Sequence, residues 1–128
     1  MKKSHVLVLS KILVVGLLVG GVGVGAIMWK IHGSLEEFTA MAQAAHPAPD
    51  ADIKSLILFL NDDAQSIDDR NHVVWTLGQL SDSEALATLE LAYTGEACNH
   101  GANLCQYELE KAIKRCGGQP NSVRISSH

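Results

Sequence analysis

The sequence predicts an all-α protein in which one N-terminal transmembrane helix is followed by a short α-solenoid of two helical hairpins. The first observation is that residues 12–29 form a run of 18 residues without a charge, and a bilayer span needs about 20 mostly apolar residues. The second is that apolar side chains after residue 51 recur at helical rather than strand intervals. The third is that this helical pattern occurs twice, as expected for stacked repeats.

Charge divides the chain at the same place. Of its 128 residues, 1–30 hold four Lys and no acidic residue, whereas 31–128 hold all 14 Asp and Glu against six Lys and Arg. Nucleic-acid affinity depends on Lys and Arg that displace counterions, so the acidic part argues against nucleic acid as a partner. The roughly 100 residues beyond the apolar run allow one small domain and exclude a large multidomain enzyme.

The predicted boundaries are a basic segment at 1–11, the transmembrane helix at 12–30, a juxtamembrane helix and Pro-containing linker at 31–51, the repeat domain at 52–118 and a disordered tail at 119–128.

The transmembrane helix is expected to be retained. The apolar run is longer than the about 7 to 15 residues of a signal-peptide core, and Trp29 followed by Lys30 suits an interfacial anchor. A cleaved signal peptide is the alternative, because residues 24–26 read Val-Gly-Ala, a tolerable cleavage site. Both interpretations send the rest of the chain across the membrane.

Lysines predict the orientation. Lys2, Lys3 and Lys11 precede the run, and Lys30 alone follows it closely. The positive-inside rule therefore places the N-terminus in the cytoplasm. The acidic domain is expected outside the cytoplasm of a single-pass cell-membrane protein, in the periplasm if the cell is Gram-negative.

Glycines within the apolar run suggest a partner helix in the bilayer. Two GxxxG spacings occur, Gly16 to Gly20 and Gly21 to Gly25. Small residues let a neighbouring membrane helix approach closely. The expected surroundings are thus the lipid bilayer and a membrane protein complex, the alternative being that Gly is simply frequent in membrane helices.

A separate juxtamembrane helix is predicted over residues 35–45. Ser34 and Glu37 have capping-box spacing, which satisfies free amides at a helix start. The sequence His-Pro-Ala-Pro at 46–49 ends this helix, because proline lacks an amide donor and disfavours helical geometry before it.

Four further helices follow from apolar spacing and capping signals. Caps are predicted at Ser66 and, through a capping box, at Ser81 and Glu84, and helix ends at residues 61–63, at Gly95 and at 117–118. The expected inward faces are Ile53, Leu56, Ile57 and Leu60; Val73, Thr76, Leu77 and Leu80; Leu86, Leu89 and Tyr93; and Cys105, Leu109, Ala112, Ile113 and Cys116.

These helices match in pairs. A shift of 36 residues places Val73, Thr76, Leu77 and Leu80 on Leu109, Ala112, Ile113 and Cys116, and a shift of 33 places Ile53 and Leu56 on Leu86 and Leu89. The second shift is shorter than the first by three residues, and this difference places an insertion in the loop before the last helix. Two stacked helical hairpins are therefore expected.

The segment 52–118 resembles a HEAT-like repeat of the type found in phycobilisome lyases. The resemblance is carried by Asp69-Arg70, by Val-Trp-Thr-Leu-Gly-Gln-Leu at 74–80, and by Asp82-x-Glu84-Ala85-Leu86 with Leu89. It implies an α-solenoid fragment whose concave face binds another protein; by analogy alone, a tetrapyrrole ligand is a further possibility. Two units are fewer than the three or more usually needed, so a staple, a dimer or a partner protein is expected.

The inserted loop contains two of the three cysteines. A disulfide between Cys98 and Cys105 is predicted, which an oxidising compartment favours and which would stabilise the second hairpin by about 2 to 3 kcal/mol. Free thiols, a bridge from Cys98 to Cys116, and a metal site of Cys98, His100 and Cys105 with an unnamed fourth ligand remain alternatives. Cys105 and Cys116, if on one helix, lie about 16 Å apart, too far for a disulfide.

The predicted function is a non-enzymatic, membrane-anchored protein-interaction module, an accessory or assembly subunit of a membrane protein complex. Trp75 lies off the predicted inward face of its helix and is the candidate partner contact, with packing against the neighbouring hairpin the alternative. No nucleophile with a base at motif spacing and no cofactor motif is recognised. The alternative function is a redox- or metal-responsive module built on Cys98, His100 and Cys105.

Overall fold

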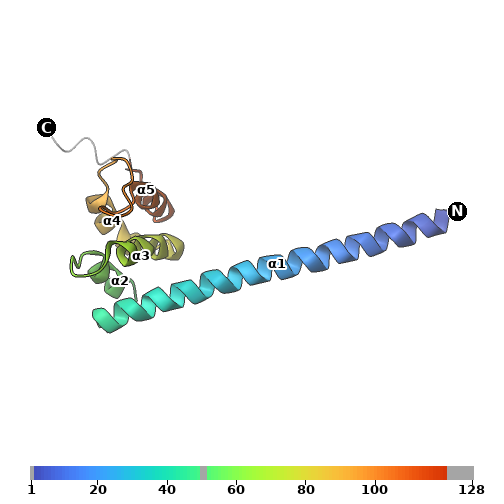
Figure 1. Cartoon of the computed structure of the whole chain (residues 1–128), viewed down its shortest axis with the longest axis horizontal. Helices are drawn as coiled ribbons and strands as arrows, with labels where there is room; N and C mark the ends of the chain where they lie inside the picture. Colours follow the sequence, from blue (N-terminus) through green and yellow to red (C-terminus); the bar gives the residue numbers. More distant parts are fainter. Residues whose placement is uncertain (1, 50–51, 121–128) are drawn as a thin grey trace. The chain divides into compact units, whose positions relative to one another are not determined.

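The computed structural model describes residues 2–49 and 52–120, with side chains from Ser10 onward. Within these residues the secondary structure is helical and contains no strand, which confirms the all-α prediction (Figure 1). The chain divides into two compact units, residues 1–36 and 37–128.

Helix α1 (Lys2–Ala45) is the long apolar helix expected from the sequence. From Ser10 onward it contains a segment long and apolar enough to cross a membrane, and the most apolar part of that segment is not buried within the chain. The large apolar side chains from Ile12 to Trp29 are exposed, Trp29 to 82%.

The predicted separate juxtamembrane helix is wrong, because α1 is helical through Ser34 and ends at Ala45. The Ser34 hydroxyl donates to the carbonyl of Lys30, 3.0 Å away and one turn earlier. A serine inside a helix can bond back in this way instead of capping a new helix. The expected end before the Pro-Ala-Pro sequence is confirmed, and the His46 amide closes the last turn on the Ala42 carbonyl.

Four shorter helical segments and a 3-10 turn make up the rest of the second unit. Helices α2 (Asp52–Leu60) and α3 (Ile67–Leu80) form one packed pair joined by a short loop. The turn η1 (Ser83–Ala85) leads into α4 (Leu86–Ala92), and α5 (Gln106–Arg115) follows after a long loop. Helix α3 contacts both α2 and α5, and α4 contacts α5 (Figure 1).

The core of this unit contains most of the predicted inward positions. The equivalent positions that are buried in both halves are Leu56 and Leu89, Val73 and Leu109, Thr76 and Ala112, and Leu77 and Ile113. The matched positions Ile53 and Leu86 are both partly buried against this core. Leu80 differs from its equivalent, since it is 41% exposed whereas Cys116 is buried. Leu80 is the last residue of α3, and the left-handed conformation of Ser81 turns the chain at that point. Two buried side chains that the apolar pattern missed are Phe59 and Val74.

Helices α3 and α5 cross most closely at Gly78. A Cβ atom on Gly78 would lie 3.0 Å from both the Cα and the Cβ of Ala112. That distance is shorter than ordinary van der Waals contact between carbons. The glycine thus permits the close approach of the two helices.

The starts of the helices after α1 confirm one predicted cap and correct another. Ser66 caps α3 by accepting the Asp69 amide, as predicted. Ser81 does not begin the next helix, because its φ of 54° is left-handed whereas an N-cap is extended; Asp82 is the cap instead and accepts the Glu84 amide at 2.8 Å.

The end of α5 is also confirmed. The Gly118 amide donates to the Ile113 carbonyl and the Gly117 amide to the Lys114 carbonyl, with Gly117 at a φ of 91°. This is the Schellman pattern, which requires a residue that tolerates a left-handed backbone. Gly95 also has a positive φ, but it lies in the loop beyond the end of α4.

The predicted disordered tail lies mostly outside the described residues, as do residues 50–51 of the linker. Pro120, within that predicted tail, is described and is buried.

Candidate functional site

The loop between α4 and α5 is the inserted segment expected from the sequence, and Gln106 anchors its first part. The Gln106 Oε1 accepts the amides of Thr94 and Gly95 at 2.6 and 3.1 Å. Its Nε2 donates to the carbonyls of Ala92 and Leu104. Gln106 is 8% exposed, so its own amide group is shielded from water and is satisfied by these backbone partners.

The second part of the loop brings Cys98 and Cys105 together. Their Sγ atoms are 2.7 Å apart, Cys98 exposed and Cys105 buried. A disulfide bond measures about 2.05 Å, so these are free thiols in the structure and the bond itself stays a prediction. Cys116 lies at the other end of α5, where its buried Sγ is 3.7 Å from the Leu77 carbonyl oxygen.

The pKa values of the two neighbouring thiols are shifted in opposite directions. Hydrogen bonding from Cys105 and then from the Tyr107 amide lowers the pKa of Cys98 below its usual value. Burial raises the pKa of Cys105, and the hydrogen bond with Cys98 raises it further. Cys98 is thus the sulfur that more readily becomes a thiolate.

The metal alternative receives no geometric support. No group of three or more His, Cys, Asp or Glu side chains in the part of the chain that the structure describes is arranged to hold a metal ion. His100 and both sulfurs belong to that part. The structure therefore does not gather Cys98, His100 and Cys105 into a ligand set.

A cavity of about 440 Å³ lies beside the loop. The loop supplies one wall through residues such as Ala97 and Asn103, and α3 and α4 supply another through Arg70 and Leu91. Leu91 is a large apolar side chain that is 88% exposed, and the predicted inward faces did not include it.

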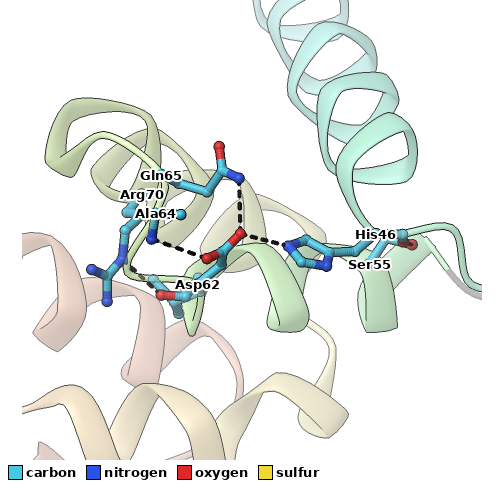
Figure 2. Close-up of polar contacts among 7 residues, drawn as sticks. His46, Ser55, Asp62, Ala64, Gln65 and Arg70 are labelled. Carbon is cyan, nitrogen blue, oxygen red and sulfur yellow. Dashed lines mark hydrogen bonds and ion pairs between the residues drawn. The ribbon is translucent and has the colours of Figure 1, made fainter.

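A second polar cluster centres on Asp62, just after α2 (Figure 2). Its carboxylate accepts the Gln65 side-chain amide at 2.8 Å and the Ala64 backbone amide at 3.0 Å, and it pairs with His46 Nε2 at 3.0 Å. These contacts, led by Gln65, hold the pKa of Asp62 below its ordinary value. The Ser55 hydroxyl donates to the His46 carbonyl at 2.7 Å. These bonds attach His46, the residue that follows α1, to α2 and to the segment just after it.

Beside this cluster, Arg70 binds the end of α2. Its Nε donates to the Leu60 carbonyl and its guanidinium pairs with Asp63, both at 2.8 Å. The Asp62 and Asp63 side chains thus serve as hydrogen-bond acceptors within the fold.

Trp75, the predicted partner contact, is half-buried. It borders a narrow gap against α5, whose other side includes Glu108, Lys111 and Ala112. Part of the Trp75 side chain therefore faces the neighbouring hairpin, as the alternative interpretation of the sequence expected.

The glycines of the two GxxxG spacings in the first unit have free space around them. A Cβ atom added at Gly16, Gly20, Gly21 or Gly25 would meet nothing within 4 Å. The contact of these positions with another helix stays a prediction.

Sequence reasoning missed Gln106 and the pairing of His46 with Asp62. Gln106 is one polar residue at the start of an amphipathic helix, and no spacing rule distinguishes it from a solvated glutamine. His46 and Asp62 lie 16 residues apart, beyond the reach of helical periodicity. Comparison with protein-family models, with curated proteins and with solved structures found no match for the chain.

Proposed function

We propose that the protein is a non-enzymatic, single-span membrane protein that acts as an accessory or assembly subunit of a membrane protein complex. Its second unit would be a two-unit HEAT-like solenoid outside the cytoplasm, and its N-terminus would lie in the cytoplasm.

The observation that carries this proposal is the unburied apolar part of α1. The run over residues 12–29 is exposed on every side within the chain. A helix that is apolar all round requires an apolar environment, which is a protein core or a membrane. Since the chain supplies no such core around this run, a bilayer is the environment that fits.

The open glycines support a partner within that bilayer. Close backbone approach between membrane helices relies on small residues, and both GxxxG pairs leave such space. The partner's transmembrane helix would lie against one of these two faces.

The second unit supports an interaction role because its core is small and repeats. Equivalent positions of the two hairpins are buried alike, and the second helices of the hairpins, α3 and α5, pack on each other. Two units are fewer than solenoids usually need for stability, so a partner protein would complete the stack. The exposed part of Trp75, the exposed Leu91 and the acidic surface are the candidate contacts.

The test is purification of the tagged full chain in a mild detergent, followed by mass spectrometry of stoichiometric companions. Two paired variants, Gly16→Ile with Gly20→Ile and Gly21→Ile with Gly25→Ile, fill opposite GxxxG faces with equal bulk. Each pair is the matched control for the other. We expect one membrane-spanning companion that is lost from one pair and kept by the other.

Trp75→Ala and Leu91→Ala test the contact of the second unit with the same companion. Loss of the companion in either variant, with the domain still folded, would place a contact there. Recovery of the wild-type chain as a clean monomer without a stoichiometric companion would contradict the proposal.

A further inference from the structure

The cysteine pair is asymmetric in a way that a purely structural bridge does not require. Cys98 is exposed on the loop, whereas Cys105 is 3% exposed at the N-cap of α5. An external reagent reaches Cys98 and not Cys105. The Sγ atoms are nevertheless 2.7 Å apart, so whatever bonds to Cys98 comes within reach of Cys105.

The start of α5 prepares Cys98 for this chemistry. The Cys98 Sγ accepts the Tyr107 amide at 3.2 Å, one of the amides that the first turn of a helix leaves without an internal partner. Such amides and the positive end of the helix dipole favour a thiolate, which is the reactive form of cysteine. The lowered pKa of Cys98 and the raised pKa of Cys105 agree with this geometry.

We propose that Cys98 and Cys105 form a reversible thiol–disulfide pair, in which Cys98 exchanges with external disulfides and Cys105 closes the intramolecular bond. The co-reactant is a disulfide donor, either a small molecule or a protein. This inference concerns the loop alone and stands independently of the proposed membrane-complex function.

The exchange proceeds in two balanced steps. The Cys98 thiolate attacks one sulfur of the donor, forming a mixed disulfide and releasing the other donor sulfur as a thiolate. Cys105 then loses its proton and attacks the Cys98 sulfur, which releases the second donor thiolate. Two electrons pass from the cysteine pair to the donor, and both cysteine protons end on the two donor thiols or in water.

Closure of this bond would change how the loop is held. Gln106 ties the loop at residues 94 and 95. The segment from 98 to 105 is held by non-covalent contacts, which are the contact between the two thiols, the Tyr107 amide on Cys98 Sγ, the bond of the Cys105 amide to Asn71 Oδ1 and two turn bonds to the Asn99 carbonyl. The disulfide would restrain this second segment covalently. Because Ala102, Asn103 and Leu104 line the cavity, oxidation would also restrain one cavity wall.

The test uses the reduced full chain in detergent with oxidised glutathione as the donor, followed by intact mass and peptide mapping. We expect the wild-type chain to lose two hydrogens, keep no glutathione and link Cys98 to Cys105. Cys105→Ser should accumulate one glutathionyl group on Cys98, because the closing thiol is absent. Cys98→Ser should acquire neither modification, and Cys116→Ser, the matched control, should behave as wild type.

A reactivity measurement on the unaltered chain keeps the test independent of variant folding. Under native conditions, iodoacetamide should label Cys98 before Cys105 and Cys116, with a pH midpoint below the ordinary value for a thiol. Equal labelling of the three cysteines, a Cys98 to Cys116 link, glutathionylation of Cys105 in a folded Cys98→Ser chain, or a folded Cys105→Ser chain without an adduct would each overturn the proposal.

Discussion

At the scale of single residues, buried or shielded polar groups hold the second unit together at points where its helices end. Asp62 collects three hydrogen-bond partners after α2, and Gln106 satisfies four backbone groups before and within the loop. In both cases one side chain joins segments that are far apart in the sequence. The contribution of such a side chain to the free energy of unfolding is expected to depend on whether its partners find other hydrogen bonds when it is removed.

Asp62 predicts a dependence of stability on pH. Its pKa in the folded chain is below the ordinary value of 3.8, so the carboxylate contributes stability above the unfolded-state pKa and loses it as pH falls through the folded-state pKa. Asp62→Asn should therefore lower the urea midpoint at pH 7, and the difference from wild type should shrink as pH falls below the ordinary carboxyl pKa. Trp75 fluorescence in a Trp29→Phe background measures the midpoint.

The exposed Asp68 offers the matched control, because Asp68→Asn also removes one acidic charge near a helix end. A difference between Asp62→Asn and wild type that stays constant from neutral to acidic pH would contradict the role assigned to the carboxylate.

Gln106 predicts an effect on both the stability of the second unit and the order of the loop. Gln106→Ala leaves the amides of Thr94 and Gly95 without their side-chain acceptor, and loss of a hydrogen bond typically costs about 0.5 to 1.5 kcal/mol. The variant should unfold at lower urea and exchange amide hydrogens of residues 94–105 faster. Gln79→Ala on α3 is the control, and an equal loss in both variants would count against the anchoring role.

At the scale of elements, local signals explained most of the helices and their caps. Apolar spacing predicted the buried faces of α2, α3, α4 and α5, and Ser66 and Gly117-Gly118 were recognised as the ends of helices because capping acts within a few residues. The start of η1, the turn that leads into α4, was harder to predict, since Ser81 and Asp82 are both acceptable caps by residue type. The left-handed backbone of Ser81 decides between them, and a residue pattern does not contain that angle.

The crossing of α3 and α5 predicts intolerance of a side chain at Gly78. A Cβ atom there would be 3.0 Å from Ala112, and overpacking of a close-packed core costs about 1 to 3 kcal/mol. Gly78→Val should lower the urea midpoint by a corresponding amount. Gly101→Val is the matched control, because a Cβ atom at Gly101 meets nothing within 4 Å. Equal destabilisation by both changes would show that the close approach to Ala112 is not the cause of the loss.

At the scale of the whole molecule, the chain combines two units with opposite solvent requirements. The first unit has an unburied apolar run that suits lipid, and the second has a small core and an acidic composition that suit water. The proposed membrane anchor and domain follow from this contrast.

The proposed topology predicts which side of the membrane exposes Cys98. After mild reduction, a membrane-impermeant maleimide added to sealed spheroplasts should label the wild-type chain and not Cys98→Ser, because Cys98 is the exposed cysteine. The labelled chain should remain in the membrane after alkaline extraction at its full length. Labelling that requires permeabilisation would reverse the orientation, and a shortened soluble product would show a cleaved signal peptide.

Helical character, the apolar run and most buried positions could be read from residue order, because they depend on neighbours within about one or two turns of a helix. The bond of Gln106 to the loop, the His46 pair with Asp62 and the half-burial of Trp75 emerged only with the folded chain. Those features join surfaces brought together by packing between helices, and that geometry depends on many side chains at once.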